Sequence, residues 1–287
     1  MIVWLASYPR SGNTLLRTVL KRCLDLDSFA DEPVHVESPL RTDNTLIGNL
    51  ELQEPWPQFY ARASQSTERV LVKTHLPPRD DSPFIYVVRD GRSAVKSYVK
   101  YYEHYVPGHA ANLFRLIAGD DAYGDWTSHY RAWNERPRAR GLLVRFQELV
   151  DVSDENLRRL AAFLGHSGPV ERWSNPIQDL ARAEPGFFDG GGKPRFEREQ
   201  DWSALVDDCF GFFHHELMAK LGYARGAAPD IAPEKRALFE WIRDLTRRSR
   251  ELMGVCDERL ALIERLHGEA QKRLDIINAL SAERRAG

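Results

Sequence analysis

The chain has 287 residues, of which 43% are hydrophobic and 29% are charged, and its 40 basic and 42 acidic residues give a formal charge of −2. Such a length provides a sizeable core for one large or two small domains, and the balanced charge argues against a nucleic-acid-binding protein. Three cysteines far apart in the sequence (Cys23, Cys209 and Cys256) argue against a disulfide scaffold and favour a reducing compartment, for which we predict the cytoplasm.

Short apolar runs alternate with segments of helical period over the first two-thirds of the chain. The run at residues 2–7 is too short to span a membrane, and no basic segment precedes it. It therefore predicts a buried strand and neither a signal peptide nor a transmembrane segment. Similar runs, typical of parallel strands buried on both faces, follow at residues 70–74, 84–88 and 142–146. Apolar residues at helical spacing predict helices over residues 13–24, 93–104 and 154–164.

This alternation predicts an α/β fold for residues 1–226, with an open central parallel sheet flanked by helices. Two less regular segments, residues 33–57 and the Gly-rich residues 186–193, are expected to be surface loops. Residues 230–287 form a C-terminal arm in which apolar residues approximate a heptad seam. We expect a long helix or a helical hairpin there, and a coiled coil that forms a homodimer is one role open to it.

The segment between the first strand and the first helix has the composition of an anion-binding loop. Residues 7–14 read S-Y-P-R-S-G-N-T, and the small residues leave backbone N–H groups at a helix N-terminus, where the dipole favours phosphate or sulfate. Arg10 adds a permanent positive charge. A plain turn in which Asn13 or Thr14 caps the helix is the alternative. The GxxxxGK[ST] pattern of a Walker A loop is absent from the sequence.

Two later strands also end in polar residues. Lys73 and His75 would share a face at the end of the strand 70–74, and a neighbouring lysine disfavours the protonated imidazole, as a general base requires. A hydrogen-bonded structural histidine is the alternative. Arg89 leaves the strand 84–88 and Ser97 lies on the next helix, where a guanidinium and a hydroxyl suit a phosphate. A local ion pair of Arg89 with its neighbouring aspartate is the alternative.

Together, these three segments resemble the sulfotransferases that use 3′-phosphoadenosine 5′-phosphosulfate (PAPS). Residues 8–14 match the family's Y-P-[KR]-S-G-x-T loop, and residues 73–75 match its K-T-H element. Arg89 and Ser97 match its 3′-phosphate element, in which an arginine stands eight residues before a serine. Each motif alone is common, but three of them in order at three strand ends form a specific pattern.

Two further matches extend the resemblance over residues 1–225 and leave the C-terminal arm outside it. Residues 144–149 look like the family's strand before an R-Y-E-D-L turn. Asp201 and Trp202 look like the end of its R-x-G-x-x-G-D-W segment.

The resemblance implies a P-loop-NTPase-like fold and in-line transfer of a sulfonyl group from PAPS to a hydroxyl or amine, with adenosine 3′,5′-bisphosphate (PAP) as the product. The implied acceptor is a small molecule, a carbohydrate or a peptide natural product. His75 would act as the general base, while Lys73 and Arg10 would stabilise charge during transfer. The residues expected to bind the donor are Arg10, Ser11, Gly12, Asn13, Thr14, Arg89, Ser97 and Arg195. This chemistry requires no metal, and we expect none, because the sequence holds no cluster of metal-ligating residues.

Several positions depart from the family pattern. Leu15 stands where many members have a tryptophan against the adenine, and Phe146 replaces a tyrosine whose hydroxyl could bind the nucleotide. Glu197 stands where a glycine is expected, so residues 190–193 could supply the 3′-phosphate loop in place of Arg195. Arg10 takes the place of a lysine that is common in cytosolic relatives and keeps its charge.

The segment 101–133, which is rich in aromatic residues, is expected to wall the acceptor pocket together with residues 33–57.

Two other functions remain open on the sequence. A nucleotide-dependent kinase would use a similar anion-binding loop but requires a Walker lysine, which is missing. A non-catalytic scaffold would bind a nucleotide through the α/β domain and recruit partners through the arm.

Overall fold

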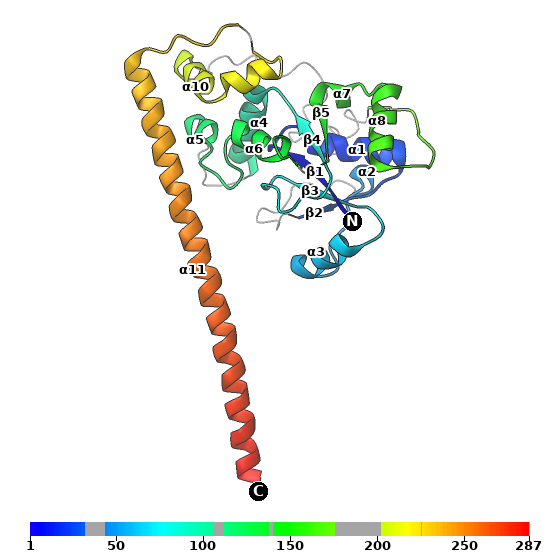
Figure 1. The fold of residues 1–287 in the computed structure, drawn as a ribbon, viewed down its shortest axis with the longest axis vertical. Coiled ribbons are helices and arrows are strands. Elements are labelled where there is room, and N and C mark those ends of the chain that lie inside the picture. The colour runs from blue at the N-terminus through cyan, green and yellow to red at the C-terminus, as the bar shows by residue number, and fades with distance from the viewer. Residues whose placement is uncertain (32–43, 106–111, 138–139, 176–201, 225, 287) are drawn as a thin grey trace. The chain divides into compact units, whose positions relative to one another are not determined.

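The computed structural model describes residues 1–287 except 32–43, 106–111, 138–139, 176–201, 225 and 287. It divides into two compact units, Met1–Arg236 and Ala237–Gly287. The first unit contains a five-stranded sheet in the order β2-β3-β1-β4-β5, in which all neighbouring strands are parallel (Figure 1). The strands are β1 (Ile2–Ser7), β2 (Phe29–Ala30), β3 (Val70–Thr74), β4 (Phe84–Val88) and β5 (Gly141–Arg145). The predicted open parallel sheet is confirmed.

Helices follow β1, β2, β4 and β5, whereas β3 leads to β4 with no helix between them. Those of the first unit are α1 (Asn13–Leu24), α2 (Asn44–Ile47), α3 (Trp56–Gln65), α4 (Gly91–Tyr105), α5 (Leu113–Ala118), α6 (Trp126–Asn134), α7 (Phe146–Val150), α8 (Asp154–Leu164) and α10 (Ala204–Lys220). The predicted bounds of α1 and α8 are confirmed, and α4 is longer than expected by two residues at its start and one at its end.

The fourth predicted strand, residues 142–146, is shifted by one residue. β5 ends at Arg145 because the Glu148 carboxylate accepts the backbone N–H of Arg145 at 2.8 Å, which starts α7 with Phe146. This strand also lies at the edge of the sheet and is only partly buried, whereas β1 and β4 are buried throughout, as predicted. β2, which the sequence analysis did not predict, has two residues and pairs with β3.

β1 lies in the centre of the sheet between β3 and β4. Its residue Ala6 pairs with Thr74 of β3, and Ser7 pairs with Val87 of β4. Because parallel strands end at the same edge, the three polar segments predicted from the sequence meet at the carboxyl end of the sheet, where open α/β sheets bind ligands.

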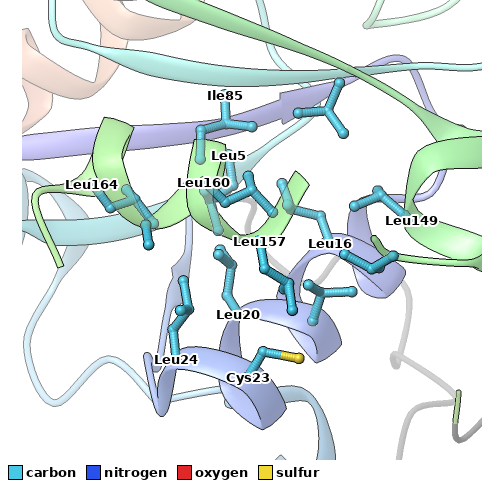
Figure 2. Packing of buried hydrophobic residues seen from close by; sticks show 14 of the residues in the cluster. Leu5, Leu16, Leu20, Cys23, Leu24, Ile85, Leu149, Leu157, Leu160 and Leu164 are labelled. Carbon is cyan, nitrogen blue, oxygen red and sulfur yellow. The ribbon is translucent and has the colours of Figure 1, made fainter. Parts of the chain in front are cut away.

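One face of the sheet packs against α1 and α8. Leucines of both helices meet Leu5 of β1 and Ile85 of β4 in a continuous buried cluster (Figure 2). Leu16 and Leu20 of α1 are at most 1% exposed, and full burial of one leucine stabilises a fold by roughly 1.5–3 kcal/mol. This packing fixes α1, and therefore the loop that precedes it, against the sheet.

The alternate residues of β1 and β4 face α6 instead. The Trp133 ring of α6 lies 6.4 Å from that of Trp4, and the Tyr130 ring lies 5.7 Å from that of Tyr86. Successive residues of a strand point to opposite faces, so helices cover the central strands on both sides.

The C-terminal arm is a single helix, α11 (Pro233–Ala286), and not a helical hairpin. Apolar side chains such as Leu252, Ile263 and Leu266 are more than half exposed on it. Across the described residues, no helix combines the length and the apolar character needed to cross a membrane.

Candidate functional site: the carboxyl end of β1, β3 and β4

The loop between β1 and α1 has the backbone geometry of an anion-binding turn. Arg10 and Gly12 have φ angles of 61° and 108°, and the Ser11 N–H donates to the Tyr8 carbonyl at 3.2 Å. A left-handed conformation is uncommon for a residue with a side chain and is found mainly where function constrains the backbone. The loop leads directly into α1, which begins at Asn13 and has Gly12 as its N-cap residue.

The N-terminus of α1 is not capped by the side chain of its N-cap residue. Gly12 has no side chain that could cap, and the first helical bond runs from the Leu16 N–H to the Gly12 carbonyl. The Asn13 amide donates instead to the Leu5 carbonyl at 2.7 Å. The alternative in which Asn13 or Thr14 forms the N-cap is therefore wrong. The backbone N–H groups of residues 13–15 have no partner within the helix. They lie at the positive end of the helix dipole, where an anion is favoured.

Three polar side-chain atoms of residues 8–13 are buried with no hydrogen-bond partner among the described residues. They are Tyr8 Oη, Ser11 Oγ and Asn13 Oδ1, on residues that are 0%, 1% and 4% exposed. Because buried polar atoms are nearly always hydrogen-bonded, this deficit fits a loop that completes its contacts with a polar ligand.

Direct contacts join the loop to the Arg89–Ser97 segment. The Arg10 Nε donates to Ser97 Oγ of α4 at 3.2 Å, and the Arg89 Nη1 donates to the Arg10 carbonyl at 3.0 Å. The Arg89 guanidinium also lies 4.5 Å from the centre of the Phe146 ring, and that of Arg10 lies 5.4 Å from the Tyr101 ring. Two guanidinium groups and a hydroxyl thus gather beside the N-terminus of α1.

His75 lies one residue beyond β3, which ends at Thr74, and its place on the same face as Lys73 stays a prediction. Its Nδ1 is 2.7 Å from the Ser7 carbonyl and 3.3 Å from Ser7 Oγ. A carbonyl oxygen only accepts, so this hydrogen bond assigns the proton to Nδ1, and in the neutral ring Nε2 is the basic nitrogen. Lys73 is half-buried in β3, paired with Leu5 of β1.

Two tyrosines from the aromatic segment 101–133 lie at this edge. The Tyr123 ring meets the His75 ring edge to face at 5.9 Å, and Tyr101 lies against Arg10 as given above. Of the other segment expected to wall an acceptor pocket, residues 33–57, the part at 33–43 lies outside the described residues.

Comparison with known proteins identifies the family. The sequence model of the sulfotransferase domain matches residues 2–182, more than half of the chain. The chain belongs to the sulfotransferase family. Mouse sulfotransferase 4A1 is 26% identical over 182 residues, which cover 58% of this chain and 60% of the relative. Mouse sulfotransferase 1B1 is 25% identical over 187 residues, which cover 56% and 57%. The chain therefore spans about 60% of the length of the curated relatives it matches.

Solved structures show a weaker likeness to this chain. Mouse sulfotransferase SULT7A1 complexed with PAP is 18% identical, with a TM-score of 0.42, over 87% of this chain and 88% of that structure. Retinol dehydratase in complex with androsterone and inactive cofactor PAP is 17% identical, with a TM-score of 0.39, over 87% and 79%.

Some predicted site positions of this chain fall outside the described residues. These are Arg195, Glu197 and the Gly-rich residues 190–193. Trp202 is described, and its indole N–H donates to the Asp207 carboxylate at 2.8 Å. Leu15, at the position of the family's tryptophan, is partly buried and packs against the hydrophobic cluster that includes Leu16 and Leu20.

Within the part of the chain that the structure describes, no group of three or more His, Cys, Asp and Glu side chains could hold a metal ion. His214 is fully buried, with Nδ1 2.8 Å from the Thr127 hydroxyl and Nε2 3.0 Å from the Ile117 carbonyl. Both of its ring nitrogens are therefore occupied by hydrogen bonds that hold α10 to α6 and α5.

His129 and Trp133 of α6, which no sequence motif singles out, have side chains that reach the segment around His75. His129 Nε2 is 2.8 Å from the His75 carbonyl, and the Trp133 Nε1 donates to the Leu76 carbonyl at 3.1 Å. Their four-residue spacing on a helix was visible, but the spacing alone fits an ordinary core face.

Proposed function

We propose that this sulfotransferase-family chain transfers a sulfonyl group from PAPS to a hydroxyl or amine of an acceptor, with His75 as the general base. One observation carries the proposal. The loop contacts Arg89 and Ser97, and the His75 ring lies at the same edge of the sheet with its Nδ1 2.7 Å from the Ser7 carbonyl. These groups supply anion binding and a proton acceptor at one edge of the sheet.

The residues of the loop suit the 5′-phosphosulfate end of the donor. The helix dipole and the backbone amides at the start of α1 favour a dianion, and Ser11 Oγ lacks a partner among the described residues. Arg89 and Ser97 suit the 3′-phosphate, because a guanidinium and a hydroxyl together bind several phosphate oxygens. Arg195, outside the described residues, is proposed as a further 3′-phosphate ligand. The bound donor supplies an activated sulfonyl group.

The chain's own residues would then move one proton and stabilise charge. His75 accepts the acceptor's proton at Nε2, while its Nδ1–H stays hydrogen-bonded to Ser7. General-base catalysis of this kind contributes roughly 10²–10⁴-fold to a rate. Arg10, which cannot give up its proton, and Lys73 contribute positive charge where negative charge develops.

Sulfonyl transfer can be tested with radiolabelled PAPS and a panel of phenols, sugars and alcohols. We expect label in at least one acceptor, and a loss of turnover of roughly 10²–10⁴-fold in His75→Ala with unchanged PAP affinity in calorimetry. Normal turnover of this variant would remove His75 from the base role.

Thermal shift distinguishes the other candidate functions. A sulfotransferase is stabilised by PAP, whereas a kinase is stabilised by ATP with Mg²⁺. Stabilisation by PAP without transfer to any acceptor in the panel would support the non-catalytic scaffold instead.

The acceptor is proposed to be a small molecule, a carbohydrate or a peptide natural product.

The helix α11 is proposed to join two copies of the chain in a homodimer. Leu252 and Leu266 stand two heptads apart along α11, as do Ile263 and Ile277, and these side chains are 66%, 53%, 61% and 57% exposed. An apolar heptad seam favours a left-handed coiled coil. Light scattering should show a dimer of the full chain and a monomer of Ile263→Asp; equal masses for the two proteins would reject this role.

A cytoplasmic location is likewise proposed. Cys23 and Cys209 are buried free thiols and Cys256 is an exposed one. Free thiols persist in a reducing compartment, so recovery of the protein from periplasm or medium with oxidised cysteines would argue against this location.

A further inference from the structure

We propose that α6 positions the base: His129 and Trp133 hold the backbone of residues 75 and 76 and so fix the place of the His75 ring. This inference rests on the proposed function of His75. It assigns His129, Trp133 and Tyr86 as positioning residues, which act through His75 and touch no reacting atom.

The two α6 side chains hold consecutive carbonyl groups just after β3. His129 Nε2 is 2.8 Å from the His75 carbonyl, and the Trp133 Nε1 donates to the Leu76 carbonyl at 3.1 Å. The donors stand four residues apart and therefore lie on one face of the helix. β3 ends at Thr74, so these bonds hold backbone that the sheet ladder does not reach.

Tyr86 of β4 fixes the orientation of the His129 ring. Its hydroxyl is 2.8 Å from His129 Nδ1, and the two residues are 1% and 2% exposed. The His75 carbonyl can only accept, so His129 Nε2 carries a proton and, in the neutral ring, Nδ1 accepts from the tyrosine hydroxyl. The Tyr86 hydroxyl, the His129 ring and the His75 carbonyl thus form a chain of hydrogen bonds with matched donors and acceptors.

As a result, His75 is held from two directions. The Ser7 carbonyl of β1 binds its ring at Nδ1, and His129 of α6 binds its main chain. Without the α6 bonds, the ring would remain attached to β1 but its backbone could shift. A displacement of a reacting group by about 1 Å can reduce a rate by about 10²-fold.

α6 is itself anchored, so it can serve as a rigid support. The Asp125 side chain caps its N-terminus by accepting the Ser128 N–H at 2.8 Å. A second contact joins α6 to α10: the Thr127 hydroxyl lies 2.8 Å from Nδ1 of His214, which is fully buried. Residues held by a packed scaffold keep a functional group in position better than a loop does.

The test compares variants that remove one hydrogen bond each. Trp133→Phe removes the bond to Leu76, Tyr86→Phe removes the bond to His129, and His129→Phe removes both bonds of the imidazole. His129→Gln is the conservative variant, because its amide N–H can reach the His75 carbonyl. Trp173→Phe is the matched control: its indole also donates to a carbonyl, that of Val150 at 3.3 Å, away from the site.

We expect kcat to fall by about 10–10²-fold in His129→Phe and Trp133→Phe, with PAP affinity unchanged. His129→Gln should recover most of that loss, and Trp173→Phe should match the wild type. Circular dichroism at the assay temperature selects the folded variants, and Tyr86→Phe, which loses one oxygen atom, provides a mild variant with a smaller loss in the same direction.

A second readout does not depend on transferase activity. In protein with ¹⁵N-labelled histidine, the His75 ring should have the Nδ1–H form in the wild type, and its nitrogen resonances should move in His129→Phe and Trp133→Phe but not in Trp173→Phe. Unchanged resonances and unchanged kcat in both folded variants would overturn the inference. Shifted resonances in a protein that transfers no sulfonyl group would sustain the positioning role and refute the proposed function.

Discussion

Replacement of Gly12 by alanine tests the packing of the anion-binding loop. Gly12 has a φ of 108°, and a Cβ added to it would lie 2.6 Å from Cδ2 and 3.1 Å from Cε2 of Phe146. Two separate effects therefore oppose the substitution: the backbone angle disfavours any side chain, and the Phe146 ring occupies the space.

The magnitude follows from these two effects. A left-handed backbone costs a residue with a side chain roughly 1–2 kcal/mol. Overpacking against the ring adds about 1–3 kcal/mol. The total of about 2–5 kcal/mol is large for a domain stabilised by about 5–15 kcal/mol, and should lower the Tm by roughly 4–20 °C.

Thermal and urea unfolding of Gly12→Ala measures this loss, and Gly222→Ala separates the two effects. Gly222 has a φ of 73°, but an added Cβ there would meet no atom within 4 Å, so this control should lose the backbone contribution alone. Adding Phe146→Ala to both the wild type and Gly12→Ala should give a coupling of about 1–3 kcal/mol. A Gly12→Ala protein no less stable than Gly222→Ala, or a coupling near zero, would refute this packing.

Three other predictions concern charge and protonation. Arg89→Ala should weaken PAP binding by about 1.5–3 kcal/mol, and equal affinities in calorimetry would reject its role in 3′-phosphate binding. Burial lowers the pKa of His214 from 6.5 to about 4, so the unfolded chain binds more protons between these pH values. The free energy of unfolding should therefore fall by on the order of 3 kcal/mol from pH 6.5 to 4, in urea titrations, and a pH-independent value would contradict this. Iodoacetamide should label Cys256 quickly and the other two thiols only on unfolding, because burial raises the pKa of Cys23 to about 11 and of Cys209 to about 12.

The central strands were predictable because a strand buried on both faces requires a continuous run of apolar residues. β1, β3 and β4 are continuous apolar runs, and their predicted bounds are confirmed residue for residue. β5 was misplaced by one residue because the Glu148 carboxylate, three positions away, binds the Arg145 N–H and starts a helix. The two residues of β2 are strand only by pairing with β3, which no local pattern reports.

At the site, the residue types were predictable and their contacts were not. The sequence indicated Arg10, Arg89 and Ser97 as anion ligands, but not that the first hydrogen-bonds to both of the others. The role of His129 was invisible because its side chain binds a backbone carbonyl 54 positions away, and a carbonyl belongs to every residue type. Contacts of that kind require the fold.

The most direct test of the account is a calorimetric comparison of PAP with adenosine 5′-monophosphate, which lacks the 3′-phosphate, on the wild-type chain. A site in which Arg89 and Ser97 hold that phosphate predicts tighter binding of PAP by about 1.5–3 kcal/mol, which is roughly 10–150-fold. Equal affinities for the two nucleotides, or no binding of PAP, would contradict it.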